Sequence, residues 1–193
     1  GLEIEGAWGY FKRNLSGMFL TIPASEKILG KEEMGAQIGR LASGIYSSVG
    51  KARLKSLAIL GIQLKGVPLS ARIASEIKAK SDLEIPVGTV DISMYRDDIG
   101  FKKTLPRIYE TDIPFELDGR IIVLADDVLH TGRTIRAALD AITHFGRPGM
   151  IRLAVLLDRG MREFPIQADF VGSLWNVPAS KKVEVRWAET DGE

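Results

Sequence analysis

The sequence predicts an α/β fold, in which a mainly parallel, twisted sheet carries helices on both faces. Short apolar segments of strand length alternate along the chain with amphipathic segments of helix length. This alternation is typical of right-handed strand–helix–strand crossovers. The length of 193 residues is sufficient for one domain with a sizeable core. No internal repeat or low-complexity linker divides the chain.

The first half of the chain is expected to supply two helices and two strands. Over residues 31–48 the apolar side chains recur every three or four positions, on one face of a helix that Gly50 closes. The run SLAILGI at residues 56–62 resembles a strand buried on both faces. Pro68 suits the first turn of a second helix, and residues 86–95 are predicted to form another strand.

A long loop and the remaining elements follow. Residues 96–117 show no periodicity and contain charged clusters and two prolines, so we expect a long, mobile loop, which at this length is usually either functional or disordered. A buried strand is predicted over residues 121–125 and a helix over 134–145. After the turn GRPG, strands are expected over 150–157 and 182–187.

Composition excludes several classes of protein. Lys and Arg number 26 against 25 Asp and Glu, so the chain lacks the positive field of a nonspecific nucleic-acid binder. Without cysteine, disulfides, thiolate metal sites and a cysteine nucleophile are excluded. No apolar run approaches the roughly 18 residues of a membrane span. We therefore expect a cytoplasmic protein with no membrane partner.

The N-terminal segment, residues 1–17, has neither the charged region nor the apolar core of a signal peptide. Two interpretations stay open. The segment is a cloning remnant or extended gene start, or it is a natural amphipathic extension that packs Trp8, Tyr10 and Phe11 on the body. The rest, residues 18–193, is predicted to form a single domain.

One segment carries the chemistry, IVLADDVLHTGRT at residues 122–134. Four apolar residues lead to the carboxyl edge of the predicted sheet, where open α/β folds bind ligands. Two adjacent carboxylates, Asp126 and Asp127, follow, and a turn of small and hydroxylated residues then opens into a helix. The paired acids suit a ligand that donates two hydroxyl groups, such as the diol of a ribose.

The turn itself suits a phosphate monoester. Unpaired N–H groups and the positive dipole end lie at a helix N-terminus. Thr131 and Thr134 would add hydroxyl donors, and Gly132 would allow close approach of the backbone. The structural alternative is a buried strand followed by a helix whose N-terminus favours acidic neighbours.

The order of four apolar residues, two acids and TGRT resembles the 5-phosphoribosyl-1-pyrophosphate (PRPP) motif of type I phosphoribosyltransferases. From about residue 28 to 192 the chain is similar to the PyrR family, pyrimidine-operon attenuators that are also uracil phosphoribosyltransferases. This resemblance implies the type I phosphoribosyltransferase fold, with a long flexible loop and a small C-terminal hood at about 159–190. The other specific stretches are DISMYRDD (91–98), GRPGMIRLAVLLDRG (146–160) and REFPIQADFVG (162–172).

The resemblance implies the reaction uracil + PRPP → UMP + pyrophosphate, and hence uracil, PRPP, UMP and pyrophosphate as binding partners. It also implies a homodimer or higher homo-oligomer. Displacement at the anomeric carbon passes through an oxocarbenium-like state, so catalysis means positioning, charge stabilisation and water exclusion. Mg²⁺ is the expected cofactor. It would be held by the substrate without direct protein ligation, with water between the ion and Asp126 or Asp127.

Site residues follow from the same resemblance. Catalytic roles are implied for Asp126, Asp127, Lys65 on the leaving pyrophosphate and Arg96 at the start of a closing loop. The family usually has a hydroxylated residue and Arg where this chain has Leu64 and Lys65, and lysine gives up bidentate geometry. Phe170 suits the core as well as a platform for the base. The remaining phosphate residues are Leu64, Gly66, His130, Thr131, Gly132, Arg133 and Thr134, and the base residues are Asp158, Arg159, Phe170 and Val171.

RNA binding is expected to be mostly lost. The family's RNA-contacting residues on the first helix fall on Gly39, Ser43 and Ser48, none of which carries a charge. Arg162 is kept, but Gln167 occupies the next basic position, and each lost cation weakens binding to phosphates. Two alternatives remain open: a nucleotide-sensing RNA attenuator with little turnover, and a phosphoribosyltransferase for another base, a purine or orotate.

Overall fold

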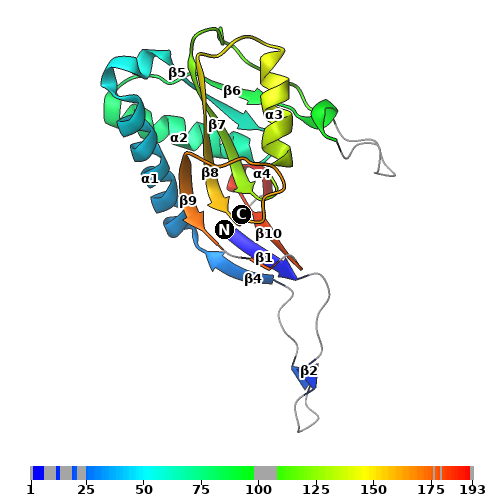
Figure 1. Cartoon of the computed structure of the whole chain (residues 1–193). Coiled ribbons are helices and arrows are strands. Elements are labelled where there is room, and N and C mark those ends of the chain that lie inside the picture. The colour runs from blue at the N-terminus through cyan, green and yellow to red at the C-terminus, as the bar shows by residue number, and fades with distance from the viewer. Residues whose placement is uncertain are drawn as a thin grey trace.

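A five-stranded parallel sheet forms the centre of the molecule (Figure 1). The computed structural model describes residues 2–6, 12–13, 19–20, 25–97, 108–175, 177–178 and 180–191. All four strand pairings in the sheet are parallel, which confirms the predicted fold class. In spatial order its strands are β6 (Val87–Val90), β5 (Leu57–Ile62), β7 (Ile121–Leu129), β8 (Met150–Asp158) and β9 (Phe170–Leu174).

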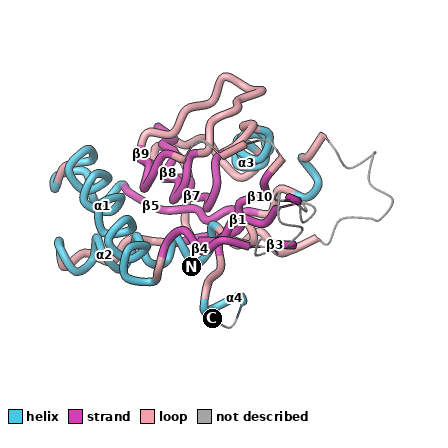
Figure 2. Tube along the Cα trace, turned by 90° about the horizontal axis from the view of Figure 1, so that it is seen from below, coloured by secondary structure: helices cyan, strands magenta, loops and turns pink. Residues whose placement is uncertain are grey.

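Helices cover both faces of this sheet. The neighbours α1 (Lys31–Val49) and α2 (Gly66–Ser81) lie on one face, and α3 (Arg133–Thr143) lies on the other (Figure 2). Because side chains alternate along a strand, each strand serves two cores. Ile59 packs in the core under α1 and α2, whereas Leu60 packs in the core under α3.

Several element bounds differ from the predictions. The expected strand over residues 86–95 ends at Val90, because the Asp91 carboxylate accepts hydrogen bonds from the backbone N–H groups of Ser93 and Tyr109. These contacts turn the chain into a short 3₁₀ helix, Ser93–Tyr95. Another 3₁₀ helix, Lys51–Ser56, precedes β5.

β7 is longer than predicted, and β9 was not predicted. Asp126 and Val128 still pair in register with Val155 and Leu157 of β8, so the two acids lie inside the strand and not after it. The predicted helices also shift slightly. α2 begins two residues before Pro68, and α3 covers Arg133–Thr143.

Only part of the predicted long loop is described. Residues 98–107 lie outside the described residues, as do Trp8, Tyr10 and Phe11. In the described part, Asp112 and Thr89 exchange two backbone hydrogen bonds, with N···O distances of 2.7 and 3.0 Å. The second half of this connection therefore lies along the edge strand β6.

Both ends of the chain enter a second, antiparallel sheet with the order β10-β1-β4. The predicted tail strand is β10 (Lys181–Val185); it pairs with β1 (Leu2–Gly6), which also pairs with β4 (Ser25–Leu29). β2 (Lys12–Arg13) pairs with β3 (Phe19–Leu20), and α4 (Ala188–Asp191) follows β10. Within the described ranges, the helices are too short or too polar to cross a bilayer.

Candidate active site

The turn between β5 and α2 meets the end of the acidic strand β7. The two strands are neighbours, with Gly61 opposite Ala125. A Cβ atom on Gly66 would lie only 2.2 Å from the carbonyl oxygen of Ala125, so glycine is required for this close approach. The turn includes a cis peptide bond between Gln63 and Leu64, and the Leu64 side chain is exposed. Lys65, the predicted pyrophosphate ligand, precedes Gly66 in this turn, and its charge acts on Asp127 of β7.

The two acids lie side by side, Asp126 buried and Asp127 partly buried. The Asp126 carboxylate accepts a hydrogen bond from the backbone N–H of Asp127 (3.0 Å), and the Asp127 carboxylate accepts one from Val128 (2.7 Å). Burial, and then the charge of Asp127, raises the pKa of Asp126 well above its ordinary value. Burial also raises the pKa of Asp127 to about 6. The pair therefore favours a bound proton, hydroxyl donor or cation.

Nearby cations act on this pair from two sides. The positive charge of Arg96 offsets part of the rise in the pKa of Asp126, and that of Lys65 offsets part of the rise in the pKa of Asp127. The pair also suits a hydrated magnesium ion, since two adjacent carboxylates, one of them buried, gain from a neighbouring cation. Two carboxylates cannot complete an octahedral shell, and no group of three or more possible ligands occurs among the described residues. The ion would keep several of its waters.

The raised pKa of Asp127 predicts how the stability of the protein depends on pH. Because the pKa of Asp127 rises from 3.8 to about 6 on folding, the folded protein binds an extra proton between these values. Without ligands, the free energy of unfolding should then increase as the pH falls from 7 towards 4. Asp127→Asn should stabilise the protein at pH 7, and this gain should shrink at pH 5. Urea unfolding at both pH values checks this, and an equal gain at both would contradict it.

The predicted phosphate turn lines a cavity of about 210 Å³. Gly132 adopts a left-handed conformation, with φ of 90°, directly before the first residue of α3. Phe164 and Ile166 cover this glycine, since an added Cβ would lie 3.2 Å from the Cβ of Phe164. The structure thus brings Arg96, from the start of the long loop, together with the whole phosphate turn. The residues that line the cavity are Arg96, Val128, Leu129, His130, Thr131, Gly132, Arg133, Thr134 and Ile135.

The side chain of Arg133 is engaged elsewhere. Its guanidinium forms ion pairs with Asp97 and Glu163 and lies over the ring of Phe164, 5.1 Å from the centroid. Arg133 stays a predicted residue of the phosphate turn, and its guanidinium is held by two carboxylates. Arg133 thereby joins the start of the long connection to the segment after β8.

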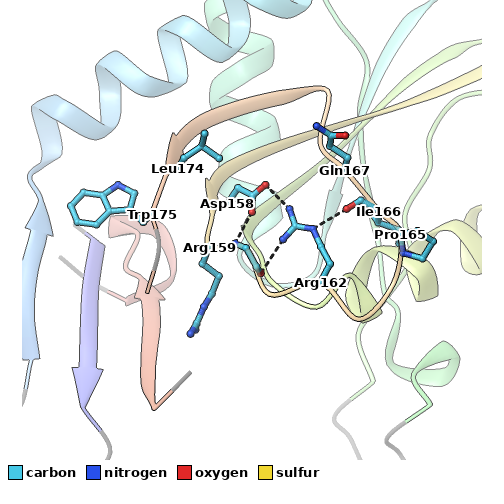
Figure 3. A pocket seen from close by; sticks show the side chains of 9 residues that line it. Asp158, Arg159, Arg162, Pro165, Ile166, Gln167, Leu174 and Trp175 are labelled. Carbon is cyan, nitrogen blue, oxygen red and sulfur yellow. Dashed lines mark hydrogen bonds and ion pairs between the residues drawn. The ribbon is translucent and has the colours of Figure 1, made fainter. Parts of the chain in front are cut away.

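A second cavity, of about 740 Å³, lies where the base was predicted to bind (Figure 3). It combines one buried carboxylate, that of Asp158, with apolar and aromatic walls. Of the four predicted base residues, Asp158 and Arg159 line it. The full lining is Asp158, Arg159, Gly160, Arg162, Pro165, Ile166, Gln167, Leu174 and Trp175.

For Phe170 both a place in the core and a platform for the base were predicted, and the structure packs its partly buried ring against the core. A Cβ on Gly44 of α1 would lie 3.4 Å from the Phe170 ring, so this ring packs in the core under α1. Val171 points to the opposite core, with Ile166. The reason is that Phe170 begins strand β9, whose side chains alternate between the two faces.

Arg159, which was predicted to bind the base, lines this cavity and also contacts other segments. Its backbone N–H donates to the carbonyl of Leu129, next to the phosphate turn. Its side chain runs away from Arg162 towards β10 (Figure 3), and its Nη2 donates to the carbonyl oxygens of Pro178 (3.2 Å) and Lys181 (3.0 Å). The guanidinium therefore fastens the C-terminal segment.

Arg162 was predicted to be a residual RNA contact, but its guanidinium joins three parts of the site (Figure 3). It forms an ion pair with Asp158 and donates to the carbonyl oxygens of His130 and Ile166, both at 2.8 Å. A fourth bond reaches Gly160. Two opposite charges four residues apart after a buried strand were the available sequence signal for this contact.

Removing this arginine should destabilise the protein. Arg162→Met would leave the buried Asp158 carboxylate without its cation, so we expect a loss of about 2 to 3 kcal/mol in the free energy of unfolding. Arg152→Met breaks the more exposed pair with Asp169 and should cost only about 0 to 1 kcal/mol. Denaturant unfolding compares the two variants. Equal losses would mean that the bonds of Arg162 to Asp158, His130 and Ile166 add no more stability than an exposed ion pair.

Comparison with known protein sequences gives consistent results. The family model "Phosphoribosyl transferase domain" matches residues 24–186. The "Bifunctional protein PyrR" of Roseiflexus sp. is 48% identical over 169 residues, covering 86% of this chain and 90% of that protein. The proteins of the same name from Chloroflexus aurantiacus and Thermus thermophilus are also 48% identical, and each match covers 86% of this chain and 91% of the relative.

Solved structures agree in fold. The hypoxanthine phosphoribosyltransferase of Trypanosoma cruzi superposes with a TM-score of 0.62 at 20% identity, covering 80% of this chain and 83% of that chain. A hypoxanthine-guanine phosphoribosyltransferase from Bacillus anthracis gives 0.61 at 15% identity, covering 78% and 84%. At these identities the likeness concerns the fold alone.

Proposed function

The chain belongs to the phosphoribosyltransferase family and, within it, to the PyrR group, and we propose that it transfers the phosphoribosyl group of PRPP to uracil. The products are UMP and pyrophosphate. One observation carries this proposal: the Lys65 turn, the two acids and the phosphate turn meet at one edge of the sheet. The reaction needs these three subsites side by side.

Each subsite has a distinct task in this proposal. The N-terminal turn of α3 holds the 5′-phosphate of PRPP through backbone N–H groups. Asp126 and Asp127 hold the ribose hydroxyls and offset the positive charge that develops at the anomeric carbon. Lys65 neutralises the departing pyrophosphate. Bound Mg²⁺, reached by the two carboxylates through water, would neutralise further charge on the pyrophosphate.

The 740 Å³ cavity supports a neutral base as the acceptor. The Asp158 carboxylate, which also accepts the backbone N–H of Gly160, retains oxygen lone pairs for an N–H group of a ring. Trp175 and Ile166 supply apolar walls. Orotate carries its own carboxylate and would meet Asp158 unfavourably, so a neutral base ranks above orotate. The resemblance to the PyrR group, and not the cavity, ranks uracil above a purine.

An RNA attenuator is the second candidate, because the relatives are called bifunctional. Two observations weigh against it. The Arg162 guanidinium already has acceptors on three segments, and Ser43 donates its hydroxyl to the carbonyl of Gly39 within α1 (2.7 Å). Tight, sequence-dependent binding to a pyrimidine-operon leader RNA would reverse this ranking.

Steady-state assays with a panel of bases test the proposal. The protein is incubated with PRPP and Mg²⁺ together with uracil, hypoxanthine, guanine or orotate, and nucleotide formation is followed by chromatography. We expect UMP to form with the highest kcat/KM. Preferential formation of a purine nucleotide or orotidylate would overturn the assignment to uracil. The absence of any product would overturn the proposal that the protein is an active phosphoribosyltransferase.

A further inference from the structure

Lys65 has an intramolecular partner from the far end of the chain. Its Nζ lies 2.6 Å from both carboxylate oxygens of Asp191, 126 residues away. Both side chains are 25% exposed. Lys65 is the cation proposed to bind the leaving pyrophosphate. In the structure its ammonium group is already paired with the Asp191 carboxylate.

The segment that carries Asp191 is firmly anchored. Trp187 is fully buried, and its backbone N–H donates to Asp191 Oδ2 (2.8 Å). Arg72 of α2 forms a bidentate ion pair with Glu189, with distances of 2.8 and 2.9 Å, and lies 4.9 Å from the Trp187 ring centroid. Because these contacts already order the segment, Asp191 loses little further conformational entropy when it pairs with Lys65. The fold of the C-terminal segment thus holds the Asp191 carboxylate in position to pair with Lys65.

The pair also lies within reach of the reaction centre. The charge of Lys65 acts on Asp127 and opposes the rise that burial causes in the pKa of that acid. The ammonium group of Lys65 therefore interacts electrostatically with Asp127 while it donates hydrogen bonds to Asp191. A pyrophosphate group that approached Lys65 would bring several negative charges next to Asp191. Such a polyanion and the Asp191 carboxylate repel each other, and both seek the same ammonium group.

We propose that Asp191 is an internal competitor of pyrophosphate: it occupies Lys65 in the free protein and gives way when PRPP or pyrophosphate binds. This inference rests on the proposed function of Lys65. The carboxylate lowers the affinity for pyrophosphate and thereby favours release of this product. The C-terminal segment Trp187–Asp191 is then a regulatory part of the active site.

The test is pyrophosphate binding to full-length Asp191→Asn, measured by isothermal titration calorimetry with Mg²⁺. Asparagine keeps an oxygen that can accept the N–H of Trp187 but removes the charge. We expect the dissociation constant to fall about five- to tenfold. An unchanged or higher dissociation constant would overturn the proposal, since the higher value would mean that Asp191 helps to hold the ligand.

Two further variants sharpen this test. Glu189→Gln removes the same charge from the same segment, but at the Arg72 pair, and should change the dissociation constant less than twofold. In a Lys65→Ala background, Asp191→Asn should lose most of its effect; a full effect would exclude competition for Lys65. If Lys65→Ala binds pyrophosphate as well as the wild type, the proposed role of Lys65 fails. Weak binding by Lys65→Ala together with an unchanged Asp191→Asn would instead refute the competition alone.

Discussion

Asp127→Asn should lower kcat/KM for PRPP by about 100- to 1000-fold. The carboxylate is held in place by the backbone N–H of Val128 (2.7 Å) and faces the charge of Lys65. An asparagine can keep this hydrogen bond but cannot offset the positive charge that develops on the ribose. Steady-state kinetics of UMP formation measure the effect. Since the same variant is expected to be more stable at pH 7, the loss would not be due to unfolding.

A matched control is Asp140→Asn on α3. Asp140 is exposed and pairs with Arg136 one helical turn away, at 3.1 Å. The substitution removes the same charge outside the site, and activity should stay within about twofold of wild type. A loss below tenfold for Asp127→Asn would mean that this acid does not act on the transition state.

Gly66→Ala should lower kcat/KM by about 100-fold, because displacement of reacting groups by 1 Å can cost this much. An added Cβ would lie 2.2 Å from the Ala125 carbonyl oxygen, so the Lys65 turn and β7 must separate. The clash is with backbone, which cannot rotate away. Kinetics and denaturant unfolding together measure the effect, and we also expect a loss of about 1 to 3 kcal/mol in stability.

Gly35→Ala provides the comparison for this variant. Gly35 is exposed on α1, and an added Cβ would have nothing within 4 Å. Alanine should leave activity unchanged and stabilise the helix by about 0.5 to 1 kcal/mol. If Gly66→Ala kept wild-type activity, the close approach of the turn to β7 would not be needed for function.

The central sheet was predictable because burial on both faces leaves a strong local pattern. β5 and β8 are continuously apolar over most of their length, and α1 carries a regular apolar face. The extension of β7 was missed because pairing with β8 holds polar residues in the strand, which composition opposes. The β1–β10 pairing joins the two ends of the chain, and no local pattern reports such a distant contact.

The site was predictable where one motif carries it. The acid pair and the phosphate turn are contiguous in sequence, and the structure brings them to the same edge. Residue type alone left Phe170 open between the core and a platform for the base, because strand alternation decides which face a side chain takes. The contact between Asp191 and Lys65 had no sequence signal, since it depends on the fold of the whole chain.

A single-turnover experiment tests the proposed transfer most directly. Protein in excess over radiolabelled uracil is mixed with PRPP and Mg²⁺, quenched at intervals and separated by chromatography. We expect the wild type to convert the uracil to UMP in one exponential phase, and Asp127→Asn to show almost no conversion on that time scale. Wild-type protein that left the uracil unchanged would contradict the assignment as a uracil phosphoribosyltransferase.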